Sequence, residues 1–203
     1  GYDWLYKYLS AEQRQTYAEK IQQLSVNRAR LAYDGKAPFD DFWVNTETNW
    51  GIIANGGVAN AILATAEYNT DECMQTLNYA LRAMEYTWYR LAPDGAWHEG
   101  IGYWAYMLGH MAKFMSCYRT AMGEGFAENY RGLDRYGYFQ CYMMGPDGLP
   151  DNFHDADSEN VQSEGQFFLA SVYGDSELMR YRRTQMDKYD IEPLVQDLIW
   201  YDT

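Results

Sequence analysis

The sequence is poor in cysteine and in positive charge. Its three cysteines, Cys73, Cys117 and Cys141, are odd in number and far apart, which argues against a disulfide framework or a cysteine metal site and predicts buried thiols. Only 16 lysines and arginines accompany 29 aspartates and glutamates, which leaves a net charge of -13 and a pI near 4.5. Because nucleic acids bind basic surfaces, this balance argues against a nucleic-acid partner.

Long apolar runs are also missing. No stretch reaches the roughly 18–20 apolar residues that a membrane-spanning helix needs, and no basic amphipathic helix suits a membrane surface. The first residues contain neither the charged nor the apolar segment of a signal peptide, so we expect that any leader was removed or never present. With 203 residues, of which 47% are hydrophobic, the chain is expected to form one soluble domain with a single core.

Aromatic residues, in contrast, are abundant. Seven tryptophans, 20 tyrosines and eight phenylalanines make up 17% of the chain. Sugar rings stack their apolar faces on aromatic side chains, and their hydroxyls pair with tyrosine and tryptophan donors, so this excess is compatible with a carbohydrate-binding cleft. An aromatic helical core is an equally good explanation of the composition alone.

The apolar residues recur at helical spacing along the whole chain, and no stretch alternates with the period of a strand. We expect a turn or short helix over 1–9 and a loop over 36–46. In the first long helix, which starts at a Ser10 capping box, the predicted apolar stripe consists of Tyr17, Ile21, Leu24, Arg28 and Leu31. The predicted long helices cover 10–34, 49–66, 73–91, 103–118, 127–143, 163–173, 176–188 and 192–200.

A short motif occurs twice, each time after an aromatic-rich helical segment. Pro93-Asp94-Gly95 and Pro146-Asp147-Gly148 lie 53 positions apart. Two helices of about 20 residues and their loops fill such a period, so the repeat predicts an all-α stack of antiparallel helical hairpins.

The first of these turns opens the most unusual stretch of the sequence, PDGAWHEGIGYWAY, from Pro93 to Tyr106. It places a histidine, a glutamate, two tryptophans and two tyrosines around Gly100 and Gly102. Glycine lets the backbone turn sharply and lets another molecule come close. The stretch therefore predicts a loop that presents Tyr103 at the start of the next helix; this loop, residues 93–100, is named the rim loop below.

The same stretch resembles the DG.W.EG.GYW segment of the heparinase II/III-like polysaccharide lyases. Two other segments resemble motifs of that family and occur in the same order: Thr48-Asn49-Trp50 with the small residues up to Ala66, and the terminal 197–202. The resemblance spans roughly residues 40–203. It implies a single domain over 1–203 that forms a partial α/α toroid, a periplasmic or secreted location, and a β-sandwich domain that follows in the family and is absent from this chain.

The resemblance also implies an activity, the β-elimination of an acidic, uronic-acid-containing polysaccharide without a metal or other cofactor. Elimination requires a group that neutralises the uronate carboxylate, a base for the C5 proton and an acid for the departing O4. Tyr103 corresponds to the family's catalytic tyrosine, as acid or as acid and base together. Asn49 corresponds to the residue that neutralises the carboxylate, and a helix start also favours an anion, although an ordinary N-cap is the simpler explanation.

The remaining site residues are predicted from their surroundings. His154 follows the second Pro-Asp-Gly turn, so we expect it at the same end of the helices as the rim loop and name it as the candidate base; the family's further histidine lies in the β-sandwich domain. His110 is predicted to lie in the core. The candidate substrate-binding residues are Trp50, Trp97, His98, Glu99, Trp104 and Tyr106, with core packing as the alternative for the aromatic ones.

Two other functions stay open. One is a glycoside hydrolase on a similar toroid, for example an unsaturated uronyl hydrolase with Glu99 and Asp155 as its carboxylates. The other is a non-catalytic carbohydrate-binding fragment. Asp155, Asp157 and Glu159 alternate like a calcium loop, but Asn160 replaces its glycine and Gln166 its final glutamate, so a solvated acidic loop is predicted. An anionic substrate would need a local basic groove, for which the candidates are Arg82, Arg90, Arg119, Arg131 and Arg135.

Overall fold

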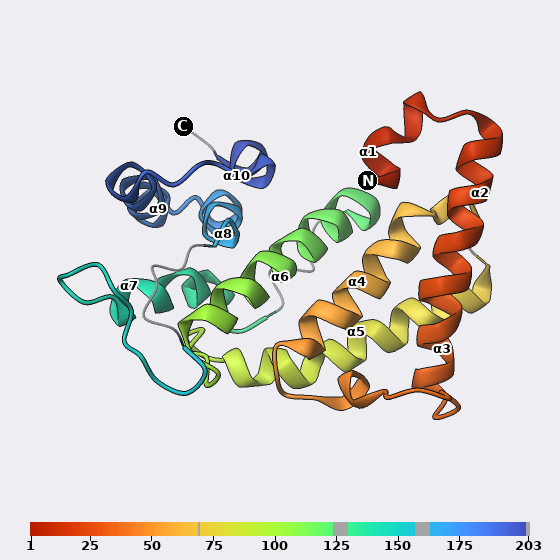
Figure 1. Ribbon diagram of the computed structural model, residues 1–203, viewed down its shortest axis with the longest axis horizontal. Coiled ribbons are helices and arrows are strands. Elements are labelled where there is room, and N and C mark those ends of the chain that lie inside the picture. Colours follow the sequence, from red (N-terminus) through yellow and green to blue (C-terminus); the bar gives the residue numbers. More distant parts are fainter. Residues whose placement is uncertain (69, 124–129, 157–162, 202–203) are drawn as a thin grey trace. The chain divides into compact units, whose positions relative to one another are not determined.

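The computed structural model describes residues 1–68, 70–123, 130–156 and 163–201 (Figure 1). Within these ranges the regular structure is helical, and the only strand-like pairing is a single antiparallel bridge between Met144 and Pro150. The predicted all-α class is therefore confirmed. The chain divides into two compact units, Gly1–Thr87 and Trp88–Thr203. The predicted single domain and its toroidal curvature stay predictions.

The first unit begins with a short helical turn and a long interrupted helix. Its elements are α1 (Tyr2–Leu5), η1 (Tyr6–Tyr8), α2 (Ala11–Ile21), η2 (Gln22–Val26), α3 (Asn27–Tyr33), η3 (Phe42–Asn45), α4 (Trp50–Ala64), η4 (Ala66–Tyr68) and most of α5 (Asp71–Leu91). Ser10 caps α2 as predicted, because its hydroxyl accepts from the Gln13 amide and the Gln13 side chain accepts from the Ser10 amide.

The predicted apolar stripe of this first helix is wrong. Tyr17, Leu24 and Leu31 are exposed, and the buried positions are instead Ala18, Val26, Ala29 and Ala32. Two physical features account for the difference. The turn η2 is a π-helix, which shifts the register of the side chains, and it packs against α4, where small alanines allow close approach. Arg28 places its guanidinium over the Phe39 ring, 4.6 Å from the centroid.

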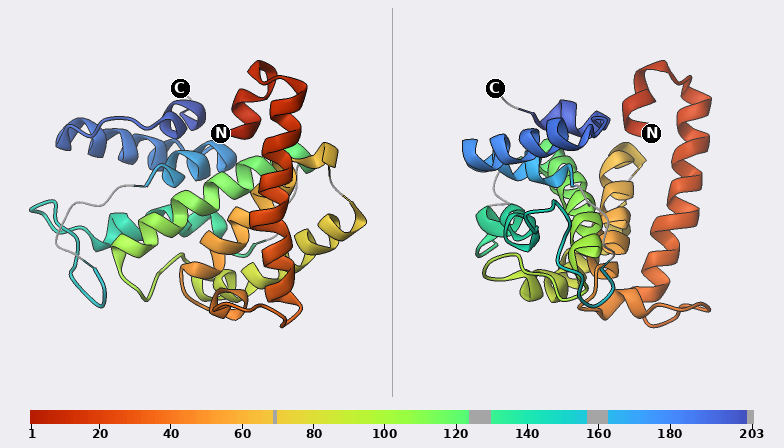
Figure 2. Two further views of the ribbon diagram at one scale, coloured as in Figure 1. Left: turned by 45° about the vertical axis from the view of Figure 1, so that its right-hand side comes forward. Right: turned by 60° about the vertical axis from the view of Figure 1, so that its left-hand side comes forward.

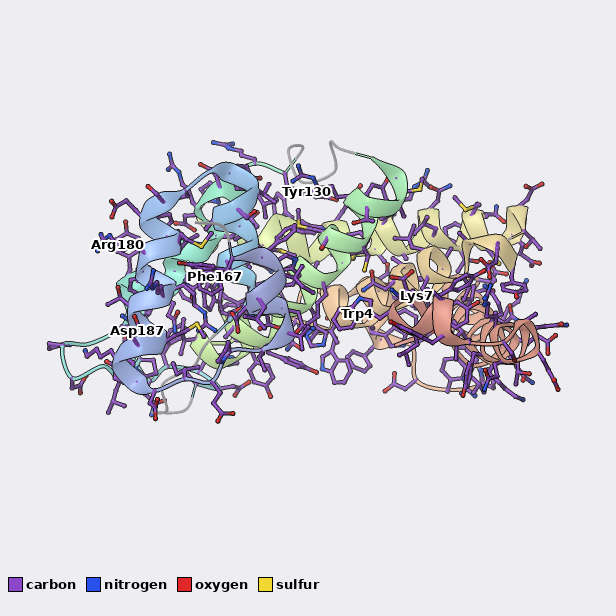
Figure 3. All side chains as sticks on the ribbon, turned by 90° about the horizontal axis from the view of Figure 1, so that it is seen from above. Trp4, Lys7, Tyr130, Phe167, Arg180 and Asp187 are labelled. Atoms are coloured by element: carbon purple, nitrogen blue, oxygen red, sulfur yellow. The ribbon has the colours of Figure 1, made fainter. Side chains whose placement is uncertain are left out.

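The second unit is arranged around α8 (Figure 2). Its elements are the end of α5, α6 (Ile101–Met122), η6 (Leu133–Tyr138), α7 (Phe139–Met143), α8 (Gly165–Tyr173), α9 (Ser176–Tyr189) and α10 (Val195–Trp200). Helix α8, which is buried over Gly165 to Ala170, contacts α6, η6, α9 and α10. Tyr130, labelled in Figure 3, stacks on Trp88 with 4.2 Å between the ring centroids.

The helix predicted over 127–143 is wrong in its described part. Gly132 adopts a left-handed conformation with φ of 81°, and the chain then continues as the 3-10 helix η6 and the five-residue helix α7. A left-handed glycine ends a helix instead of continuing it, so the apolar spacing of this segment does not produce one α-helix. Residues 124–129, which include the predicted stop at Gly125, lie outside the described residues.

Candidate functional site

The rim loop connects α5 to α6 through two turns, at 92–94 and 98–99, and the Gly100 amide donates to the Trp97 carbonyl oxygen at 3.3 Å. Asp94 accepts from the Ala96 amide at 3.2 Å, which closes the predicted Pro-Asp-Gly turn. After it, exposure alternates from residue to residue: Trp97 and Glu99 are buried, whereas Asp94, Ala96 and His98 are exposed. Asp94, Ala96 and His98 thus make up the exposed edge of the rim loop.

The buried side of the rim loop holds it in place. The Trp97 indole N–H donates to the Glu99 carboxylate at 3.1 Å, and Glu99 is only 9% exposed. The predicted stacking of Trp97 and Trp104 on substrate needs exposed rings, whereas both rings are buried, and Trp104 packs against Phe139. Core packing therefore accounts for both tryptophans, and the position of Glu99 is that of a structural acceptor.

The rim loop meets the segment after the second Pro-Asp-Gly turn. Gly100 has φ of 92°, and a Cβ there would lie 2.8 Å from the Ala156 side chain and 2.9 Å from the Phe153 carbonyl oxygen. What comes close to Gly100 is thus the protein's own chain. The junction brings His98 and His154 together with 6.5 Å between ring centroids, and the Nδ1 of His154 lies 3.2 Å from the Asp155 carboxylate.

Gly100→Ala is expected to lower the free energy of unfolding by about 1–3 kcal/mol. Its φ and ψ fall in a region that is essentially restricted to glycine, and the added methyl group meets the 153–156 segment. Gly102→Ala is the matched control, because a Cβ there meets nothing within 4 Å and alanine favours the helix by up to about 1 kcal/mol. Urea unfolding of both variants measures the difference, and equal stability would contradict the steric argument.

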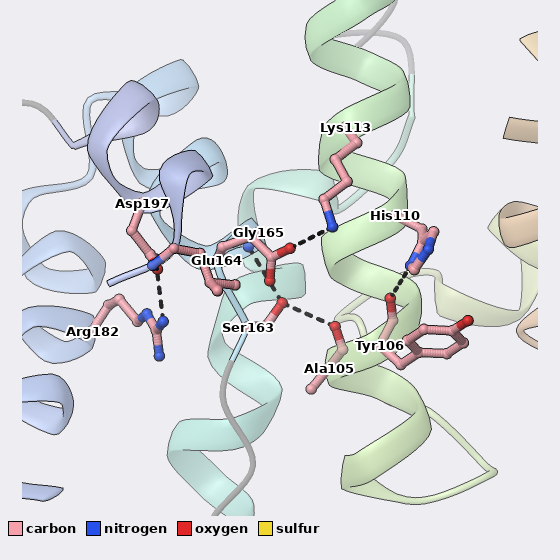
Figure 4. A network of polar contacts seen from close by, with 10 residues as sticks. Ala105, Tyr106, His110, Lys113, Ser163, Glu164, Gly165, Arg182 and Asp197 are labelled. Carbon is pink, nitrogen blue, oxygen red and sulfur yellow. Dashed lines mark hydrogen bonds and ion pairs between the residues drawn. The ribbon is translucent and has the colours of Figure 1, made fainter. Parts of the chain in front are cut away.

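Helix α6, which follows the rim loop, carries a polar stripe of Tyr103, Tyr106 and His110, of which Figure 4 shows Tyr106 and His110. Tyr103 is 38% and Tyr106 52% exposed, and His110 is half-buried, which makes its predicted core position wrong. His110 Nδ1 lies 2.9 Å from the Tyr106 carbonyl oxygen. A carbonyl only accepts, so Nδ1 carries the proton, and in the neutral ring Nε2 is the basic nitrogen. The 3-4 spacing of Tyr103, Tyr106 and His110 is the sequence signal that could have revealed this stripe.

An ion pair next to this stripe joins α6 to the start of α8 (Figure 4). Lys113 Nζ lies 2.8 Å from the nearly buried Glu164 carboxylate, which packs against Gly109. The Ser163 hydroxyl donates to the Ala105 carbonyl at 3.0 Å. Sequence reasoning missed both contacts, because residues more than 50 positions apart in the chain make them.

Asn49 and Trp50 belong to the first unit, whereas Tyr103 and His154 belong to the second. Asn49 is the N-cap residue of α4, as the simpler explanation has it, but it is buried, has a helical conformation and makes no side-chain capping hydrogen bond. Trp50 is half exposed and its ring meets Phe42 edge to face, with 5.6 Å between centroids. The meeting of Asn49, Tyr103 and His154 around one surface stays a prediction.

The terminal motif has a packing role. Asp197 and Arg182 form an ion pair at 3.2 Å, and the Trp200 indole N–H donates to the Ser116 hydroxyl at 3.3 Å. Asp202, the last residue of the motif, lies outside the described residues. The prediction of three buried thiols is correct for Cys73 only, since Cys141 is half-buried and Cys117 is exposed.

In the part of the chain that the structure describes, no group of three or more His, Cys, Asp and Glu side chains could hold a metal ion. Asp157, Glu159 and Asn160, which belong to the predicted acidic loop, lie outside that part. Within the same residues, no helix has the length and apolar character needed to cross a membrane.

No model of a known protein family matches the chain, and no curated protein matches it. The relationship to the heparinase II/III-like lyases therefore stays a prediction that rests on the three motifs.

Proposed function

We propose that the protein is a polysaccharide lyase that cleaves a uronic-acid polysaccharide by β-elimination. The observation that carries the proposal is the cluster of His98, His154 and Asp155, where the rim loop meets the 153–156 segment. The rim loop continues into α6, the helix that bears the exposed Tyr103. An acid and a base of suitable chemistry thus belong to one end of α6. The resemblance of the surrounding motif to the lyase family supports the same assignment.

The proposed reaction assigns one proton transfer to each group. His154 donates from Nδ1 to the Asp155 carboxylate, which leaves Nε2 to take the C5 proton. The electron pair of the C5–H bond forms the C4=C5 double bond, and the C4–O4 bond breaks. Tyr103 is the proposed acid, and its phenol O–H gives its proton to O4. Asn49 completes the proposal as the amide that neutralises the uronate carboxylate.

The hydrolase alternative is weaker because of Glu99. A glycosidase needs two carboxyl groups that flank the sugar bond, yet the Glu99 carboxylate is buried and accepts from the Trp97 indole. Asp155 is exposed, but its carboxylate contacts His154. These contacts favour a catalytic histidine that is oriented by a carboxylate, and they do not favour a pair of catalytic carboxylates.

The proposal also covers the fold, the domain organisation, the cellular location and the substrate of the enzyme. We infer that the helices belong to a partial α/α toroid, that a β-sandwich domain accompanies them in the full-length natural chain, and that the enzyme acts in the periplasm or outside the cell. An acidic polysaccharide is the proposed substrate, although the net charge of -13 opposes its approach. The capture rate should therefore rise with salt at low ionic strength, unless exposed arginines line the cleft.

The test uses the full-length natural chain with alginate, pectate, hyaluronan and heparan sulfate as substrates. Elimination creates a conjugated double bond that absorbs in the ultraviolet, so product absorbance is the readout. His154→Ala should lower the rate by about 10²–10⁴-fold, the loss typical of a general base. His110→Ala is the matched histidine control. Cleavage without the ultraviolet signal would show hydrolysis and overturn the proposal, and loss of activity in His110→Ala alone would make His110 the base.

A further inference from the structure

A cavity in the Trp88–Thr203 unit is lined in part by the rim loop. It has a volume of about 600 Å³, which is within the range of small-ligand sites. Asp94 and Ala96 line it from the rim loop, and the other wall comes from η6 and α7. The lining residues that matter here are Asp94, Ala96, Arg135, Tyr138, Phe139 and Tyr142.

The aromatic side chains of this cavity present ring faces. Tyr142 is 81% exposed, so its ring is available to a ligand. Tyr138 donates its hydroxyl to Asp175 at 2.6 Å, and burial together with this hydrogen bond raises the pKa of Tyr138. Because its hydroxyl is engaged, Tyr138 offers a ligand its ring. Phe139 offers an apolar surface only. Such rings suit the apolar face of a pyranose.

Two charged side chains supply the polar contacts. Arg135 is largely exposed, and its guanidinium lies 3.9 Å from the Asp134 carboxylate, too far for a hydrogen bond. Asp94 uses one carboxylate oxygen for the Ala96 amide. A guanidinium has several donors in a fixed plane and a carboxylate accepts at both oxygens, so the pair can bind neighbouring sugar hydroxyls.

The cavity is connected to the proposed catalytic cluster by the exposed edge of the rim loop. Asp94 and Ala96 line the cavity, and His98, the next side chain on that edge, faces His154. Only residues 95–97 separate Asp94 from His98 in the chain. A saccharide in the cavity would therefore reach the histidines through its next residues.

We propose that this cavity is a saccharide subsite that binds a pyranose residue of the substrate away from the bond that is cleaved. The proposal rests on the proposed lyase function, which supplies the nature of the ligand. The ring of Tyr142 stacks on the sugar, and Arg135 and Asp94 hold its hydroxyls. Binding energy from such a remote residue serves to position the reacting one, so only substrates long enough to fill the cavity benefit.

The experiment measures binding and cleavage on the full-length natural chain. Uronic-acid oligosaccharides of increasing length, prepared from the four polysaccharides above, are titrated by calorimetry. Tyr142→Ala should weaken the binding of long oligosaccharides by about 5–10-fold, as expected for the loss of one stacking ring, and leave short ones unchanged. Arg135→Gln should weaken the same long oligosaccharides. Tyr89→Ala is the matched control, since Tyr89 is 80% exposed on α5 and does not line the cavity.

The outcomes separate this proposal from the lyase assignment. Unchanged binding in Tyr142→Ala and Arg135→Gln, or an equal loss in Tyr89→Ala, overturns the subsite even if the ultraviolet product forms. Weaker binding in the two cavity variants without any ultraviolet product supports saccharide binding at the cavity and overturns the lyase. If no oligosaccharide binds the unmodified protein, the subsite is overturned as well.

Discussion

Tyr103→Phe is expected to lower the rate of elimination by about 10²–10⁴-fold, because the phenol is the proposed proton donor to O4. The substitution removes one hydroxyl and keeps the ring, and a side chain that is 38% exposed contributes little packing that depends on that hydroxyl. The protein should therefore fold normally. The rate is measured as ultraviolet absorbance of the unsaturated product, and circular dichroism checks the helical content.

Tyr106→Phe is the matched control for this prediction. Tyr106 lies three residues further along α6 and is also exposed, and its ring contacts His110. Tyr106→Phe therefore makes the same chemical change at a tyrosine that takes no part in the proposed proton transfers. Because Tyr106 is a candidate substrate-binding residue and not the proposed acid, the rate of this variant should fall far less than that of Tyr103→Phe. A normal rate in Tyr103→Phe would refute the role of Tyr103, and a loss in Tyr106→Phe instead would assign the acid to Tyr106.

Asp197→Ala is expected to lower the free energy of unfolding by about 3–5 kcal/mol. Asp197 and Arg182 are each 2% exposed and pair at 3.2 Å, and Asp197 also accepts from the Leu194 amide at 2.9 Å. Removal of the carboxylate takes a counter-charge away from a buried guanidinium, in a medium where charge is costly to bury. The loss should appear in urea unfolding as a large shift of the transition midpoint.

The same change at an exposed ion pair controls for this effect. Arg183 and Asp187 pair at 3.9 Å on α9, with both side chains more than half exposed. Asp187 is labelled in Figure 3. Asp187→Ala should change the free energy of unfolding by at most about 1 kcal/mol, since exposed pairs contribute little. Equal effects in the two variants would contradict the assignment of Asp197 as a buried, structurally required charge.

Several helix ends follow from local chemistry and were therefore predictable. Ser10 with Gln13 starts α2, and Asp175 starts α9 by accepting from the amides of Glu177 and Leu178. Gly123 ends α6 and Gly174 ends α8, both with positive φ. Caps and glycines with positive φ act within a few residues, so the sequence alone contains the information that places them.

The buried faces and the site contacts were much less predictable. Leu24 and Leu31 have the right spacing for a buried stripe, yet a π-turn and the contact with α4 bury Ala29 and Ala32 instead. His110 reads as a core residue from its spacing, and its exposure depends on what packs beside α6. Periodicity shows that a helix has faces, but the neighbouring elements decide which face is covered.

The sequence by itself determined that this protein is helical, where most helices begin and end, and that the rim loop turns at Pro-Asp-Gly, because these features depend on residues close together in the chain. Only the tertiary structure decided that Gly100 packs on the 153–156 segment, that His98 faces His154, and that Glu99 binds the Trp97 indole instead of facing solvent. The contacts of Gly100 and His98 join segments more than 50 positions apart, and the burial of Glu99 depends on what packs over the rim loop. No local pattern encodes either, because both depend on segments that come together only in the folded unit.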